Sequence, residues 1–123
     1  MINLKCKITI PISVGELLDK ITILQIKSQF SNNSYILQEL QDLTEIAKTH
    51  QVYDEQDLQE LKKVNEKLWV IEDKLRQLEK QHDFSSTFIE LARQVYLTND
   101  QRARIKKQIN EKTKSQYQEV KLH

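Results

Sequence analysis

The stretch LKKVNEKLWVIEDKLRQL, residues 61–78, contains the pattern from which the rest of the fold can be predicted. Its apolar residues recur at alternating spacings of three and four: Leu61, Val64, Leu68, Ile71, Leu75 and Leu78. This pattern is typical of a long α-helix that packs lengthwise against another helix. With Asp54 as its N-cap, we expect this helix over residues 54–81, which gives a length of roughly 40 Å at 1.5 Å per residue.

The rest of the chain is also predicted to be helical, because 123 residues include only one Gly and one Pro. We expect further helices over 14–30, 34–49, 85–97 and 99–114. The sequence Ser13-Val14-Gly15-Glu16 has the form of a capping box, and Thr98-Asn99-Asp100-Gln101 repeats that form and separates the last two helices. The helix over 14–30 has two apolar stripes, so it belongs at the centre of the fold.

A short strand pair completes the predicted architecture. Residues 4–11 alternate between apolar and polar side chains up to Pro11, and the tail over 117–122 alternates more weakly. A lone strand would leave backbone groups unpaired, so its partner is either the tail or a second copy of the chain. The sequence therefore predicts one mainly α domain over 1–123, with about five helices, a long central helix and terminal strands.

Charge and composition exclude several classes of protein. The 19 Lys and Arg residues nearly balance the 18 Asp and Glu residues, so we expect neither a nucleic-acid nor an anionic-membrane partner. No apolar run approaches the ~20 residues that span a bilayer, and the first residues do not resemble a signal peptide. Cys6 is the only cysteine, so no internal disulfide can form, and we expect a cytoplasmic protein.

Basic residues concentrate in the last predicted helix, at Arg102, Arg104, Lys106, Lys107, Lys112 and Lys114. Such a cluster could bind phosphates, but acidic segments elsewhere cancel it in the net charge of +1. We expect it to be a solvated face or to pair with Asp54, Glu55 and Asp57, and nucleic acid stays an unfavoured partner.

Three motifs resemble those of a known family. They are ITIPISVGELLDKITIL (8–24), VNEKLWVIED (64–73) and LARQVYLTND (91–100). In order and spacing they are similar to a small bacterial family, domain-of-unknown-function family 6165, over about Ile8 to Asn110. That family often has Pro where this chain has Val14. The resemblance implies a compact bacterial protein and assigns no activity, cofactor or catalytic residue.

Candidate site residues are polar side chains where apolar ones are expected, together with a polar-aromatic stripe beside the apolar seam of the long helix: Asn65, Trp69, Glu72 and Arg76. Asp19 shares a stripe with Ile23 and Ile26, and Arg93 lies between Ile89 and Tyr96. One hypothesis is a pocket in which Arg93 clamps a small anionic ligand and Asp19 or Glu72 accepts a hydrogen bond or proton. The other is a structural ion pair between Arg93 and one of these carboxylates. The candidate ligand-binding set is Asp19, Asn65, Trp69, Glu72, Arg93, Tyr96 and Asn99.

Two of these residues also have simpler interpretations. Trp69 is more often a packing residue than a stacking platform. Asn99 could help to bind an anion at a helix N-terminus, but helix capping explains Thr98, Asn99 and Asp100 equally well.

No recognisable catalytic or metal-binding pattern occurs in the sequence. The three His residues and Cys6 have no zinc-like spacing, and Gly15 alone cannot form a phosphate loop. We expect no metal and no cofactor, assign no catalytic residue, and leave open whether the protein is an enzyme. The favoured function is a non-enzymatic interaction or regulatory module whose partner is another protein or a second copy in a homodimer. The alternative is a binder or enzyme for a small anion at an interhelical pocket around Arg93, Asp19 and Glu72.

Overall fold

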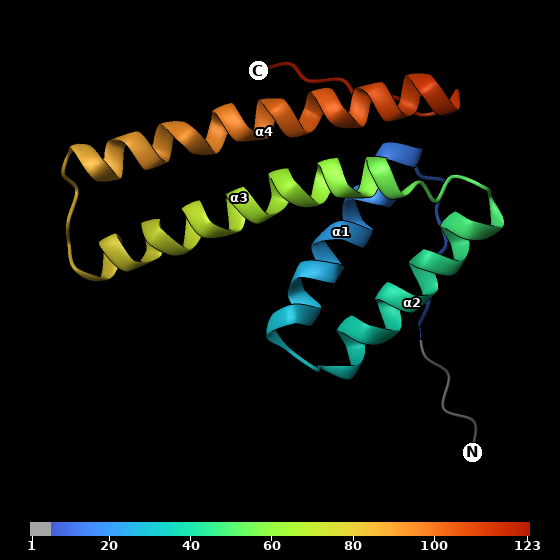
Figure 1. Ribbon diagram of the computed structural model, residues 1–123, viewed down its shortest axis with the longest axis horizontal. Helices are drawn as coiled ribbons and strands as arrows, with labels where there is room; N and C mark the ends of the chain where they lie inside the picture. The colour runs from blue at the N-terminus through green and yellow to red at the C-terminus, as the bar shows by residue number, and fades with distance from the viewer. Residues whose placement is uncertain (1–5) are drawn as a thin grey trace.

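The computed structural model describes residues 6–123, and this part of the chain contains four α-helices. They are α1 (Val14–Phe30), α2 (Ser34–Thr49), α3 (Glu55–Lys80) and α4 (Ser86–Thr113). Helices α3 and α4 form a long antiparallel hairpin, and α1 and α2 form a shorter one that packs under one end of it (Figure 1). The other end of the long hairpin projects beyond α1 and α2 (Figure 1).

Helix α1 is the centre of this arrangement, as predicted, because it contacts each of the other three helices. Its side chains Leu18 and Ile21 are fully buried. They belong to a core cluster that also contains Leu17, Ala47, Leu58, Leu61 and Ile109. Ile26 of the second stripe is 2% exposed, so both stripes contribute buried side chains, although Phe30 at the end of the helix is 67% exposed.

The predicted beginnings of the first and third helices are confirmed. The Ser13 hydroxyl accepts a hydrogen bond from the Glu16 backbone N–H at 3.1 Å, and the Asp54 carboxylate accepts one from the Asp57 N–H at 3.0 Å. The first three helices match the predicted ranges to within a residue. The Glu16 carboxylate differs from its predicted role in the capping box, because it binds Lys106 instead.

The prediction of separate helices over 85–97 and 99–114 is wrong, because α4 runs unbroken through both. The pattern Thr98-Asn99-Asp100-Gln101 lies in the middle of this helix, and Thr98 is buried there rather than capping anything. A capping pattern alone does not end a helix, since no Gly or Pro interrupts the segment and its apolar residues continue to face α3.

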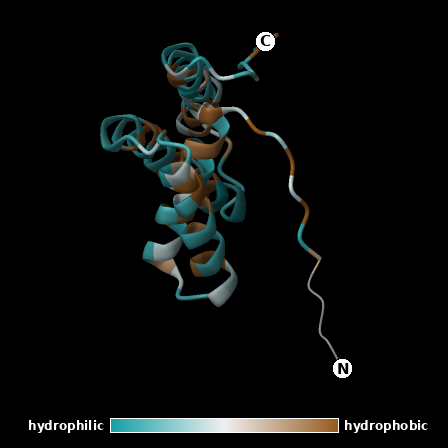
Figure 2. Cartoon of the chain, turned by 90° about the vertical axis from the view of Figure 1, so that its right-hand side faces the viewer, coloured by the Kyte–Doolittle hydropathy of each residue, from teal (hydrophilic) through white to brown (hydrophobic). Residues whose placement is uncertain are grey.

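The predicted strand pair is also wrong within the described residues, where no strand occurs; positions 4 and 5 lie outside them. Residues 6–11 are extended and exposed, with apolar side chains at alternate positions, and they lead away from the tail (Figures 1 and 2). The tail instead turns back along α4 after Lys114, which has a left-handed conformation. Ion pairs from Glu119 to Lys106 and from Lys121 to Asp100 tie it to that helix.

Candidate functional site

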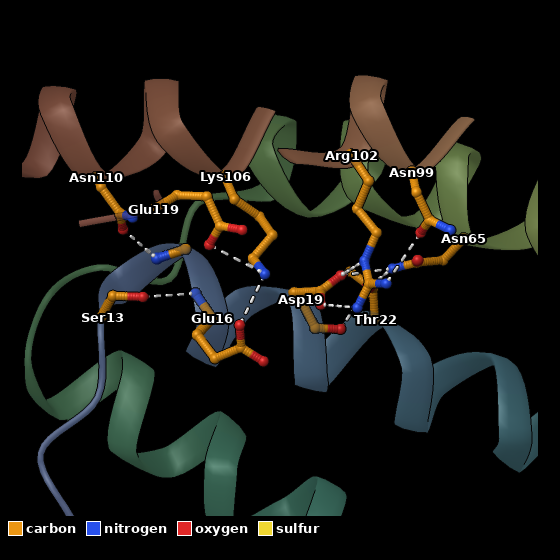
Figure 3. A network of polar contacts seen from close by, with 11 residues as sticks. Ser13, Glu16, Asp19, Thr22, Asn65, Asn99, Arg102, Lys106, Asn110 and Glu119 are labelled. Atoms are coloured by element: carbon orange, nitrogen blue, oxygen red, sulfur yellow. Dashed lines mark hydrogen bonds and ion pairs between the residues drawn. The ribbon is translucent and has the colours of Figure 1, made fainter. Parts of the chain in front are cut away.

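The carboxylate of Asp19 is the centre of a buried polar network where α1, α3 and α4 meet (Figure 3). Its side chain is 0% exposed. Arg102 of α4 donates from Nε to Asp19 Oδ1 at 3.0 Å and from Nη2 to Oδ2, so the two groups form a forked pair. Asn65 of α3 donates from Nδ2 to Asp19 Oδ1 at 2.8 Å. Three helices therefore meet at one carboxylate.

Two further side chains complete the network. Thr22 lies one turn after Asp19 on α1; its hydroxyl donates to the Asp19 carbonyl at 2.7 Å and accepts from Asn65 at 2.9 Å. Asn99 Oδ1 lies 3.5 Å from Arg102 Nη1 at the outer edge. The hydrogen bonds to Asp19 raise the pKa of Arg102, and the charges of Asp19, Glu16 and Glu119 reinforce this against the opposing effect of burial.

A second ion-pair cluster lies one turn further along α4, at Lys106. Its Nζ lies 2.7 Å from Glu16 Oε2 and 3.3 Å from Glu119 Oε2, and its side chain is only 9% exposed. Burial by itself would lower the pKa of Lys106. The hydrogen bond and charge of Glu16, together with the charges of Asp19 and Glu119, outweigh burial and raise the pKa.

Gly15 allows α1 to approach α4 closely enough for these contacts. Its backbone N–H donates to Asn110 Oδ1 at 2.7 Å. A Cβ at this position would lie 2.7 Å from the Lys106 carbonyl oxygen, so any other residue would push the two helices apart. The only glycine of the chain is therefore required by interhelical packing and has no role as a phosphate-binding loop.

The structure brings together three of the seven residues predicted to bind a ligand, namely Asp19, Asn65 and Asn99. The other four lie outside this network, on α3 and α4. Arg93 is exposed and pairs with Glu90 of its own helix at 3.0 Å, and Tyr96 is 53% exposed. Glu72 is exposed, and Trp69 is 39% exposed and stacks on Phe30 with ring centroids 5.2 Å apart. The predicted convergence of Arg93 with Asp19 and Glu72 is therefore wrong.

Arg102 forms the ion pair with Asp19 that the sequence analysis predicted for Arg93. The expected helix break at Thr98 placed Arg102 in a separate basic helix, where it looked like a surface charge. In a continuous helix, Val95, Thr98, Arg102, Ile105 and Ile109 form one stripe at spacings of three and four. A charged residue on such a stripe is the same signal that singled out Asp19. A prediction of one continuous helix across Thr98 would therefore have identified Arg102.

The polar groups of this network already form hydrogen bonds with one another, and this limits the chemistry that they can perform. Both oxygens of Asp19 already accept hydrogen bonds, and Arg102 and Asn65 donate to it from fixed helices. A carboxylate that acts as a base must reach a substrate proton, and here Asp19 is enclosed by its own partners. The arrangement is that of a buried ion pair that fixes how three helices pack.

No group of three or more His, Cys, Asp or Glu side chains within residues 6–123 could hold a metal ion. Over the same residues, no helix combines the length and apolar character needed to cross a membrane.

The fold and site define an all-helical protein of two packed helical hairpins, joined by a buried Asp–Arg pair. By comparison with protein families, residues 8–122 match the family of unknown function DUF6165, and the chain belongs to that family. Comparisons with curated proteins and with solved structures gave no match.

Proposed function

We propose that this protein is a non-enzymatic interaction module that binds a protein partner through the projecting end of the α3–α4 hairpin. The observation that supports this is a set of exposed apolar side chains at the end of α1 and on the part of the hairpin beyond it. We call the part formed by Phe30, Trp69, Ile89 and Tyr96 the distal surface; these side chains are 39–67% exposed. Exposed apolar groups gathered on one surface are typical of a protein interface.

Helical spacing places the key members of the distal surface on one side of the hairpin. Asn65 and Asn99 both lie in the network beside α1. Trp69 follows Asn65 by four residues and Tyr96 precedes Asn99 by three, so each lies one turn further out on the same helix face. This face of the hairpin is the one that α1 covers at the other end, and a helix from a partner could bind along it beyond α1.

The distal surface also includes residues that the sequence analysis assigned to a ligand. Trp69 and Tyr96 belong to it, and Glu72, which shares the helix face of Trp69, lies at its edge with Arg93 nearby on α4. Aromatic and Arg side chains are the types that most often dominate the binding energy of protein interfaces. We therefore reassign these residues from an anion pocket to partner binding.

The competing functions have weaker support. The small-anion hypothesis required Arg93, Asp19 and Glu72 at one pocket, whereas Arg93 and Glu72 are exposed away from the buried Asp19. The nucleic-acid hypothesis required free charges at the end of α4. Of the six basic residues there, Arg102, Lys106 and Lys112 are engaged by carboxylates of the same chain. We also propose a cytoplasmic location, where the lone Cys6 would remain a thiol.

A photocrosslinking experiment tests the proposed function. A photoreactive amino acid placed at Tyr96 should crosslink one discrete protein in cells that produce the chain, and the same amino acid at Gln59, an exposed position on α3 away from this surface, should not. With the purified partner, fluorescence of Trp69, the only tryptophan, should shift to the blue as its ring leaves water. Identical crosslinking patterns from Tyr96 and Gln59 would overturn the proposal.

A further inference from the structure

The hairpin has a second surface feature, a groove of about 430 Å³ between α3 and α4. Its lining includes Lys63, Lys67 and Arg104, with Glu60 as the one acidic residue and Val64 and Ile105 as apolar members. None of the three cations lies within ion-pair distance of a carboxylate in the described part of the chain. The groove therefore has a net charge of +2 that the rest of the chain does not neutralise.

This basic groove is separate from the distal surface and from the Asp19 network. Its residues on α4, among them Gln101, Arg104 and Gln108, are offset from Arg102 and Lys106, which point toward α1. Apolar side chains lie next to the groove on its side toward the hairpin end, because Val70 follows Lys67 by three residues and Leu97 precedes Gln101 by four. Val70 is 50% exposed and Leu97 40% exposed. A segment that is complementary to this groove presents acidic side chains to its cations and apolar side chains to its apolar members, as one face of an amphipathic helix does.

Helix α2 has such a face. Tyr35, Glu39, Asp42 and Ile46 follow one another at spacings of four, three and four, so they lie along one side of the helix. Tyr35 is 80% exposed and Ile46 41% exposed. Glu45 adds a third acidic residue to α2, and its one basic residue, Lys48, lies over the ring of Tyr53 at 4.9 Å. We call Tyr35, Glu39, Asp42 and Ile46 the acidic face of α2.

We infer that the occupant of the basic groove is the acidic face of α2 from a second copy of this chain. Within one chain α2 packs on α1 and does not reach α4, so the contact has to be made between chains (Figure 1). The two carboxylates of the acidic face match the +2 charge of the groove, and Tyr35 and Ile46 provide apolar side chains for its floor. The net charge of +1 per chain offers little long-range repulsion between copies.

This inference goes beyond the proposed function, because it uses neither Trp69 nor Tyr96 and concerns self-association. When each chain gives its α2 to the groove of the other, the contact occurs twice in a two-fold symmetric dimer. Because charge complementarity contributes to both contacts, the dimer should dissociate more readily as ionic strength rises.

Charge exchange between the two surfaces tests the inference. The groove variant Lys63→Glu/Arg104→Glu gives chains in which groove and α2 are both acidic, and the α2 variant Glu39→Lys/Asp42→Lys gives chains in which both are basic. By sedimentation equilibrium, each variant alone should dimerise at least about tenfold more weakly than wild type. An equimolar mixture should form a heterodimer about as well as wild type dimerises, because both contacts are complementary again.

Matched controls separate this effect from general changes in charge or folding. The variant Arg76→Glu/Lys80→Glu makes the same charge change as the groove variant at exposed positions on the opposite face of α3, and it should dimerise like wild type. Unchanged melting temperatures would establish that all variants fold. For wild type, the dissociation constant should rise at least about tenfold as NaCl increases from about 0.05 to about 0.5 M.

Three outcomes would overturn the inference. One is a wild-type chain that stays monomeric up to about 1 mM at low salt. Another is a mixture of groove and α2 variants that fails to recover dimers. The third is a wild-type dimer that the charge variants leave intact and Tyr96→Glu abolishes, which would place self-association at the distal surface and leave the proposed function standing. Loss of the Tyr96 crosslink with intact charge-dependent dimers would instead refute the proposed function alone.

Discussion

At the scale of single residues, one arginine determines how the helices are held together, and it is Arg102 rather than Arg93. Arg102 donates two hydrogen bonds to a carboxylate that no water can reach from outside, whereas Arg93 pairs with Glu90 on an exposed helix face. Loss of a buried ion pair lowers the free energy of unfolding far more than loss of an exposed one. Removal of one partner leaves the other charge without compensation only when that charge is buried, since an exposed charge is solvated by water.

The variant Arg102→Ala should therefore lower the free energy of unfolding by about 3 kcal/mol, the lower end of the range for a broken buried pair, because Arg102 is itself 27% exposed. Arg93→Ala should change it by less than about 0.5 kcal/mol. Urea denaturation at neutral pH, followed by circular dichroism, measures both. If the two variants were equally stable, Asp19 would not depend on Arg102 for its charge compensation.

At the scale of elements, most helices were easier to predict than the continuity of α4 and the contacts of the two termini. The apolar spacing of residues 61–78 and the caps at Ser13 and Asp54 are local signals, and from them the bounds of α1 and α3 were predicted to within a residue. The break predicted at Thr98 used the same kind of local signal, but there α3 packs along an uninterrupted stripe and tertiary contacts prevail over capping preference.

The site was partly predictable for the same reason. Asp19 stood out as a polar residue on an apolar stripe and Asn65 as part of a polar-aromatic stripe beside the apolar seam, and this identified two of the three helices that meet at the network. The third helix of the network is α4, which contributes Arg102. Because a break was predicted within α4, Arg102 did not stand out on an apolar stripe, and Arg93 was chosen as the partner of Asp19 instead. The prediction of a terminal strand pair was wrong because alternating apolar and polar residues indicate only that a segment could form a strand. The tail instead forms ion pairs with side chains of α4.

The continuity of α4 makes a prediction with a definite sign. Thr98 is 1% exposed, and its hydroxyl has no hydrogen-bond partner among the described residues. Thr98→Val keeps the shape and removes an unsatisfied polar group, so it should raise the free energy of unfolding by about 1 kcal/mol. If Thr98 were a helix cap, the same change would lower it by about 1 kcal/mol.

Thr22→Val provides the matched control for Thr98→Val. The Thr22 hydroxyl is equally buried, but it donates to the Asp19 carbonyl and accepts from Asn65. Its removal should lower the free energy of unfolding by about 1–3 kcal/mol. Thermal and urea denaturation of both variants checks the contrast, and a loss of stability in both would contradict the assignment of Thr98 as an unsatisfied group.

At the scale of the whole molecule, the ion pairs that join α4 to other parts of residues 6–123 all involve its C-terminal half. Arg102 binds Asp19, Lys106 binds Glu16, and Lys112 binds Asp57 of α3. All three lie in the C-terminal half of α4, where α1 also packs, while the projecting half depends on the apolar contacts between α3 and α4. The end with the distal surface should therefore open more easily than the end with the network.

The basic partners in these ion pairs make the whole molecule sensitive to alkaline pH. The pKa of Lys106 is raised above its ordinary value of 10.5, because Glu16, Asp19 and Glu119 outweigh the effect of burial. Hydrogen bonding to Asp57 likewise raises the pKa of Lys112, and burial raises that of Tyr53. In each case the folded chain holds the proton more tightly than the unfolded chain, so the stabilisation is complete below the unfolded pKa and is lost as pH rises through the folded one.

We therefore expect the free energy of unfolding to be nearly constant from about pH 7 to about pH 9 and to fall steadily above about pH 10. Lys106→Met removes the most buried of these groups, so its stability should be lower than that of wild type at pH 8 and should decline less steeply above about pH 10. Urea denaturation across this pH range measures both slopes. Lys107→Met, a neighbouring exposed lysine, serves as the control and should follow the wild-type slope. Parallel curves for wild type and Lys106→Met would show that the Lys106 cluster does not hold its proton more tightly in the folded chain, and the alkaline loss would then belong to Lys112 and Tyr53.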